Sequence, residues 1–246
     1  CLEDSGRSNS RIIQSICVVL LVLCTTTTRS IIAQSSETDL LNPETNSGGI
    51  DVMVVDLTCA NSTICQPYRP NHIVEYYGAD WCEPCESLEL MLDSIDGQEV
   101  ALIQHHPSII DQSYLNYSKH RFENQYRLLF IPSVVINNAG LLTGSGQGQE
   151  LNRTLASMTT NFSGIDDFAF SNGVIYWNTS TQNNLTVWII EPTKHEFDNR
   201  TLDNLAVDMK VINNDQTSEN LSKWITNSTT RLIIILQDDE IRQLQS

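Results

Sequence analysis

The sequence predicts an α/β fold with a mixed central sheet and flanking helices, followed by a small all-β domain of the sandwich type. Three observations predict it. Between residues 50 and 158, strand-like and helix-like segments follow the order β-β-α-β-α-β-β-α, which implies a mixed sheet with helices on both faces. A Cys-X-X-Cys motif lies where a strand meets a helix. From about residue 163 onward, short apolar runs alternate with turns rich in Asn, Asp and Thr, without a helix of useful length.

The predicted strands are short segments rich in β-branched and apolar residues between turn signals. In the first part of the chain they are residues 50–57, 72–77, 100–104, 133–137 and 141–142. The predicted helices have apolar residues at helical spacing and are residues 83–96, 111–126 and 149–158. The β-rich part contains predicted strands at 174–177, 185–190, 205–212 and 232–236. We therefore place an α/β domain at 51–162 and an all-β domain at 163–246.

The composition excludes several classes of protein. Hydrophobic residues make up 40% of the 246 residues, which is enough for a buried core and excludes wholesale disorder. The chain has 30 acidic and 14 basic side chains and a formal net charge of -16. Nucleic acids and anionic membrane surfaces are bound through clustered Lys and Arg. The acidic balance therefore disfavours both as partners.

Residues 1–33 have the layout of a secretory signal peptide. Arg7 and Arg11 precede a short apolar run, residues 12–24, which is well short of the ~20 residues that span a bilayer. The alternative is an N-terminal anchor that is not cleaved and tethers the protein to a membrane or envelope. Residues 34–50 are polar and predict a linker.

Glycosylation acceptors support export. Nine Asn-X-Ser/Thr sequences are present, where the composition predicts about four by chance. They begin at Asn61, Asn116, Asn152, Asn161, Asn178, Asn184, Asn199, Asn220 and Asn227. We expect a glycoprotein outside the cytoplasm, secreted or at the cell surface.

Four cysteines follow the leader: Cys59, Cys65, Cys82 and Cys85. An even number in an exported protein suggests two disulfides, for which three connectivities exist. Proximity in the sequence favours Cys59–Cys65 and Cys82–Cys85. We interpret the first pair as a structural loop staple, because no helix start surrounds it.

The motif Trp81-Cys82-Glu83-Pro84-Cys85 predicts a redox-active centre. At a helix N-terminus, unsatisfied N–H groups and the helix dipole stabilise a thiolate. Cys82 is therefore the expected nucleophile, and Cys85, one turn inside the helix, is the expected resolving thiol. Pro84 suits the first helical turn, where its missing N–H has no cost.

Residues 72–160 resemble a thioredoxin-fold domain. Residues 75–85, Glu-Tyr-Tyr-Gly-Ala-Asp-Trp-Cys-Glu-Pro-Cys, are similar to the active-site strand and motif of this family, and residues 131–140 resemble its cis-proline strand and hairpin. The resemblance implies that Pro132 is cis and lies beside the disulfide. It also implies that Ile131 pairs with an extended substrate segment and that Trp81 covers the motif.

A looser likeness concerns His105, Arg121, Tyr126 and the β-rich tail. Together they resemble exported prokaryotic thioredoxin-like surface proteins with a β-rich C-terminal extension.

The sequence departs from the thioredoxin pattern at one position. Tyr76 stands where the family carries a buried Asp that helps proton transfer, and alternation directs Glu75 to the other sheet face. Asp80, Glu83 and Glu86 surround the thiols, and their negative charge should raise the Cys82 pKa. A less stable thiolate favours the disulfide, so we expect a reductase or isomerase and not a strong oxidant.

The favoured function is an exported thiol–disulfide oxidoreductase that acts on protein thiols and disulfides. It would require an electron donor but no organic cofactor and no metal. One alternative is a non-catalytic surface protein that uses the fold as a scaffold for binding. A narrower option is a reductant for cytochrome or copper-site thiols, because Cys-Glu-Pro-Cys resembles that subgroup.

Two purely structural interpretations of the cysteine motif stay open beside the functional ones. In one, the four cysteines hold a structural zinc ion, and in the other Cys82–Cys85 is a structural disulfide. His105 and His106 invite a metal interpretation as well. Adjacent side chains on a strand point in opposite directions, so a shared ion is disfavoured and both are interpreted as strand-end residues.

Overall fold

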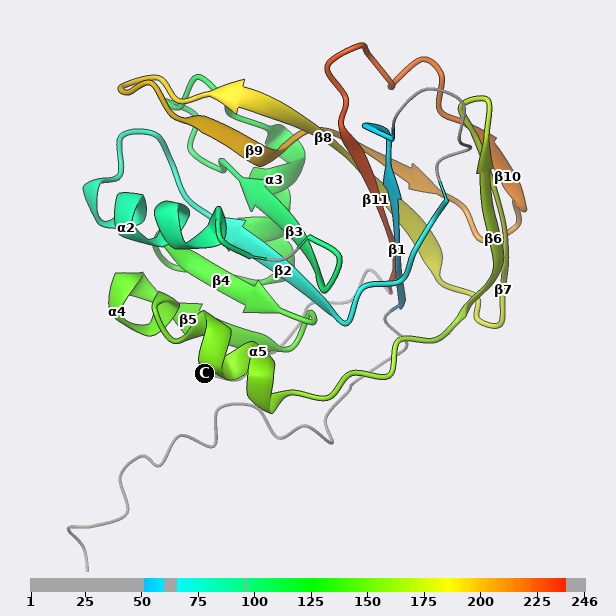
Figure 1. Cartoon of the computed structure of the whole chain (residues 1–246), viewed down its shortest axis with the longest axis horizontal. Helices are drawn as coiled ribbons and strands as arrows, with labels where there is room; N and C mark the ends of the chain where they lie inside the picture. Colours follow the sequence, from blue (N-terminus) through cyan, green and yellow to red (C-terminus); the bar gives the residue numbers. More distant parts are fainter. Residues whose placement is uncertain (1–50, 60–65, 96, 238–246) are drawn as a thin grey trace, which may run out of the picture. The chain divides into compact units, whose positions relative to one another are not determined.

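The computed structural model describes residues 51–59, 66–95 and 97–237 (Figure 1). The predicted signal peptide and linker lie outside these residues. Among the described helices, none is both long enough and apolar enough to cross a membrane.

The main feature is an eight-stranded sheet (Figure 1). Its spatial order is β1 (Asp51–Asp56), β11 (Arg231–Gln237), β8 (Asn184–Lys194), β9 (Thr201–Ile212), β3 (Val100–His105), β2 (His72–Tyr77), β4 (Ser133–Ile136) and β5 (Gly140–Thr143). Strands β2, β3 and β9 run parallel, and the other neighbours are antiparallel. The prediction of an α/β fold with a mixed sheet is confirmed.

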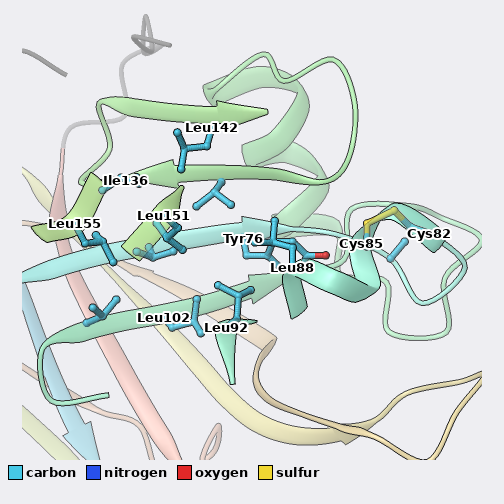
Figure 2. Packing of buried hydrophobic residues seen from close by; sticks show 14 residues of the cluster. Tyr76, Cys82, Cys85, Leu88, Leu92, Leu102, Ile136, Leu142, Leu151 and Leu155 are labelled. Carbon is cyan, nitrogen blue, oxygen red and sulfur yellow. A yellow bond between two sulfur atoms is a disulfide. The ribbon is translucent and has the colours of Figure 1, made fainter. Parts of the chain in front are cut away.

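Helices cover both faces of the β3-β2-β4-β5 half of the sheet. On one face, α2 (Glu83–Leu92) and α5 (Leu151–Ser157) bury Leu88, Leu92 and Leu151 against strand residues (Figure 2). A short helix, α4 (Gly144–Gly148), approaches α2 so closely that a Cβ on Gly148 would lie 2.6 Å from Leu88 Cδ2. This core holds the helix that carries the cysteines.

The opposite face is covered by α3 (Asn116–His120) and a π-helical turn, η1 (Arg121–Gln125). Residues of and after this turn pack against Tyr77 and Val135. The predicted helix at 111–126 is therefore wrong in its first part, where residues 111–115 form turns. Its second part is helical but changes to π geometry at Arg121.

The separate C-terminal β domain predicted at 163–246 does not form. Strands β8, β9 and β11 belong to the same sheet as β2 and β3. The remaining strands, β6 (Ile165–Ser171), β7 (Val174–Thr179) and β10 (Ser218–Asn220), form a three-stranded antiparallel sheet. Its apolar residues pack with those of β1, β8 and β11 in one core, and the described residues all belong to one compact unit.

Strand β11 explains why the C-terminal strands do not form a separate domain. Its apolar residues alternate between two cores: Leu232, Ile234 and Leu236 face the small sheet, and Ile233 and Ile235 face the other side. A strand buried on both faces needs cover on both sides. The large sheet supplies its neighbours and the small sheet covers one face, so the C-terminal strands cannot be a separate unit.

A buried ion pair lies on the α3 side of the sheet. Arg121 donates to Glu75 Oε1 at 2.7 Å and to Gln237 Oε1 at 2.9 Å. Tyr126 donates to the same Glu75 oxygen at 2.5 Å. Burial alone would raise the pKa of Glu75, but the charge of Arg121 and hydrogen bonds from His105 and Arg121 hold it well below its usual range. The pair joins β2, η1 and the end of β11.

We predict that Arg121→Ala lowers the free energy of unfolding by about 3–5 kcal/mol, because it leaves the Glu75 carboxylate buried without its partner. Arg153→Ala is the matched control: Arg153 is 73% exposed and pairs with Glu150 on the surface, so its loss should cost less than about 1 kcal/mol. Urea denaturation of the two variants measures both values. Equal costs would contradict the role of the buried pair.

Candidate redox site

Cys82 and Cys85 form a disulfide at the start of α2, with their Cα atoms 5.3 Å apart (Figure 2). Cys82 is the N-cap residue, and no side chain caps the first turn. Cys82 is 7% exposed and Cys85 is completely buried. The two cysteines are thus unequal: both belong to the core cluster, but only Cys82 is partly exposed, at the N-terminal end of the helix.

The other predicted motif residues surround the disulfide. Trp81 is 47% exposed, Pro84 lies in the first turn of α2, and Glu83 gives that turn an exposed negative charge. The Ile131–Pro132 peptide bond is cis, as predicted. Ile131 packs against the core cluster that contains Cys82 and Cys85.

A concave surface of about 500 Å³ lies beside Cys82. One side is formed by residues of the motif, from Asp80 to Glu86. The other side is formed by the connection between β8 and β9, with His195, Phe197, Asp198 and Arg200. Sequence analysis missed this second side, because nothing in the local pattern indicates that this connection reaches the motif.

Behind the disulfide, Tyr76 and Glu89 form a buried polar pair. The Tyr76 hydroxyl donates to Glu89 Oε1 at 2.9 Å, and Arg200 donates to Glu89 Oε2 at 3.1 Å. Burial and the Glu89 charge raise the pKa of Tyr76 well above its usual value. Gly78 leaves room for the Tyr76 hydroxyl, with which a Cβ at Gly78 would collide. Glu89 and Cys85 are both buried on α2, one turn apart.

The sequence had suggested that Asp80 presents a negative charge to the thiols, but in the structure this charge is not free. Its side chain is buried, with Oδ1 3.7 Å from His106 Nδ1 and 3.6 Å from His195 Nε2. Its Oδ2 accepts the backbone N–H of Glu196 at 3.0 Å. The charges around Cys82 therefore include basic groups from the β8–β9 connection, and the expected rise of the Cys82 pKa stays a prediction.

His105 and His106 point to different clusters, as alternation predicts. His105 Nδ1 lies 2.8 Å from Ser118 Oγ and its Nε2 lies 3.4 Å from Glu75, on the α3 side. Burial lowers the pKa of His105. His106 Nδ1 lies 3.0 Å from Asp111 Oδ1, beside Asp80.

Cys59 is disulfide-bonded, while its predicted partner, Cys65, lies outside the described residues. The pairing of Cys82 with Cys85 leaves neither of them free for the four-cysteine zinc site considered from the sequence.

No protein-family model matches the chain, and no curated protein sequence matches it. Among solved structures, an Agrobacterium tumefaciens protein determined by the Northeast Structural Genomics Consortium is similar over 68% of this chain and 78% of its own, with 10% identity and a TM-score of 0.43. HBP35 of Porphyromonas gingivalis is similar over 70% of this chain and 65% of its own, with 9% identity and a TM-score of 0.43. Both likenesses are too weak to assign a fold family or a function.

We predict that, after mild reduction, Cys82 reacts with an alkylating reagent about tenfold or more faster than Cys85. The reason is that only Cys82 is partly exposed and that the helix N-terminus favours its thiolate. Peptide mass spectrometry at short reaction times measures both rates in one sample. Both thiols lie in one peptide, so fragment ions assign the label to Cys82 or Cys85, and the single variants Cys82→Ser and Cys85→Ser verify the assignment. Equal rates would contradict the assignment of Cys82 as the attacking thiol.

Proposed function

We propose that the protein is a thiol–disulfide oxidoreductase whose Cys82–Cys85 pair exchanges with disulfides of other proteins. The observation that carries the proposal is the unequal placement of the two sulfurs at the start of α2. Cys82 lines the concave surface, where a substrate can approach it, and the completely buried Cys85 is bonded to it. A disulfide with only a structural role does not require one of its cysteines at an uncapped helix N-terminus.

The arrangement around the motif supports a thioredoxin-like fold for residues 72–160. A parallel pair, β3 and β2, continues into antiparallel β4 and β5, with α2 and α5 on one face and α3 on the other. A cis-proline precedes β4. In this interpretation β9, which is parallel to β3, extends the thioredoxin-like sheet.

The reaction follows from the two positions. The Cys82 thiolate attacks one sulfur of a substrate disulfide, and the other substrate sulfur leaves as a thiolate and takes up a proton. Cys85 then loses its proton and attacks the mixed disulfide at Cys82. The substrate is released with two thiols, and its two-electron reduction is balanced by oxidation of Cys82 and Cys85 to the disulfide. An external dithiol donor must reduce the pair again.

Trp81 and the cis Ile131–Pro132 segment are the proposed substrate contacts. Trp81 is the large exposed apolar side chain next to Cys82, and it suits an unfolded or extended protein segment. We further propose that the protein works outside the cytoplasm, as the predicted leader and the glycosylation acceptors suggest. No organic cofactor takes part in this exchange.

A non-catalytic scaffold is the second candidate. It is favoured by the low exposure of Cys82, 7%, and by the β8–β9 connection that lines the opposite side of the surface. In that case the disulfide would stabilise the loop without exchanging.

We predict a reversible redox couple near or below about −230 mV, on a scale where thioredoxin lies near −270 mV. The reason is that the buried Glu89 carboxylate and the acidic residues Glu83 and Glu86 in the first turn of α2 disfavour a thiolate. Titration of the mature chain against a glutathione buffer measures this couple. In parallel, Cys85→Ser should capture substrates as mixed disulfides, whereas Cys82→Ser should not. A disulfide that never exchanges would favour the scaffold, and a couple near about −120 mV would make the protein an oxidant.

We predict that Glu89→Gln slows the resolving step by about tenfold or more, because Glu89 is the buried carboxylate one turn from Cys85 and is suited to accept its proton. The measurement is single-turnover release of a mixed disulfide with Cys82 as a function of pH. Glu123→Gln is the matched control, because it removes an exposed carboxylate from η1 on the opposite face of the sheet, and it should change the rate by less than about twofold. An unchanged pH profile in Glu89→Gln would exclude Glu89 as the proton acceptor.

A further inference from the structure

We propose that Asp80, His106 and Asp111 form a binding site for one divalent transition-metal ion, with zinc as the ion that the donor set suits and with His195 turning toward the ion as a fourth ligand. The site is separate from the disulfide, and the proposal does not depend on redox activity. Three of the residues, Asp80, His106 and Asp111, have donor atoms within 4.8 Å of one another. His195 approaches Asp80 from the β8–β9 connection.

The distances between the donor atoms fit one ion. His106 Nδ1 lies 3.0 Å from Asp111 Oδ1 and 3.7 Å from Asp80 Oδ1. His195 Nε2 lies 3.6 Å from the same Asp80 oxygen. A tetrahedral zinc ion with bonds near 2.0–2.1 Å places neighbouring donor atoms roughly 3.4 Å apart. Asp80, His106 and Asp111 therefore need only small movements to hold one ion. His195 lies outside this 4.8 Å cluster and must turn further toward it.

Asp80 Oδ1 points into the cluster without a hydrogen bond. The Asp80 side chain is completely buried, and within the described residues this oxygen has no hydrogen-bond partner. A buried carboxylate oxygen without a partner is costly. The two groups that face it are imidazoles, and a shared metal ion would satisfy all three.

The remaining oxygens of both carboxylates are already held in place. Asp80 Oδ2 accepts the Glu196 backbone N–H at 3.0 Å, and Asp111 Oδ2 accepts the Asp80 backbone N–H at 2.7 Å. Metal ligands are typically oriented by such outer hydrogen bonds. Here they leave Asp80 Oδ1 and Asp111 Oδ1 facing His106 Nδ1.

The charge balance also favours a cation. Asp80 and Asp111 both have completely buried side chains, and among the described residues neither forms an ion pair with Lys or Arg. Arg200 donates toward His195 Nε2 at 3.2 Å and must turn away when the ion binds. It already contacts Asp198 and Glu89, which can retain it.

The mixture of two imidazoles and two carboxylates selects the class of ion. Magnesium and calcium prefer oxygen ligands alone and more of them. Zinc and cobalt(II) accept imidazole nitrogen and carboxylate oxygen in four-coordinate sites. The ion would join the loop before Cys82, the segment after β3 and the β8–β9 connection.

The test uses the full mature chain with Cys82–Cys85 oxidised, so that these thiols cannot bind the metal. After treatment with a chelator, the protein is titrated with zinc against a chromophoric competitor, and the bound metal is counted by elemental analysis. We expect one zinc per chain and a zinc-dependent rise in melting temperature that magnesium does not produce. Cobalt(II) should give the visible absorption of a four-coordinate site.

Asp80→Asn and His106→Gln should each weaken zinc binding at least 100-fold. Glu86→Gln, which removes an exposed carboxylate near the same surface, should change it less than twofold. Circular dichroism and the intact disulfide verify folding, and either variant alone suffices if the other does not fold. Less than half an equivalent of zinc in the wild type, or equal losses in Glu86→Gln and His106→Gln, would overturn the proposal. An unaltered affinity in both ligand variants would do the same.

Discussion

The alternation of side chains along β2 is the constraint on which the rest of the structure depends. Strand β2 is an interior strand of the large sheet, between β3 and β4, so neighbouring residues face opposite layers. Glu75 faces the α3 layer, where Arg121 and Tyr126 neutralise and satisfy it. Tyr76 faces the α2 layer, where it contacts Glu89 behind the disulfide. One strand thus separates a charged structural network from the candidate redox site, and a register slip by one residue would exchange the two.

The C-terminal strands form part of the candidate redox site. Strand β9 pairs with β3 through Gln104 and Leu205, and β8 pairs with β9 along most of its length. This pairing directs the β8–β9 connection toward the start of α2. There, His195 and Arg200 meet Asp80 and Glu89. A segment more than 100 residues after the motif therefore supplies its basic groups, and loss of the C-terminal strands would expose buried carboxylates as well as apolar surface.

The features that sequence analysis predicted correctly are those set by local chemistry. The Cys-X-X-Cys motif lies at a strand-to-helix junction because a proline in the first turn and an apolar helix face encode it locally. The partners of the C-terminal strands could not be predicted, because periodicity indicates a strand but not which sheet it joins. The continuous apolar run 232–236 was the available signal, since such runs are typical of strands buried on both faces. Nothing local connects His195 with Asp80, so the basic side of the site required the tertiary structure.

Burial decides which charges influence the thiols most. Glu83 and Glu86 are near Cys82 in the sequence, but both are exposed. Water and salt strongly weaken the electrostatic interactions of exposed charges. The Tyr76–Glu89–Arg200 group and the Asp80 cluster include residues distant in the sequence, and both are largely shielded from water. Charges in a medium of low effective dielectric constant interact over longer distances. The charges of these two buried groups should therefore influence the thiols more than the acidic first turn does, and Arg200, which contacts both groups, connects them.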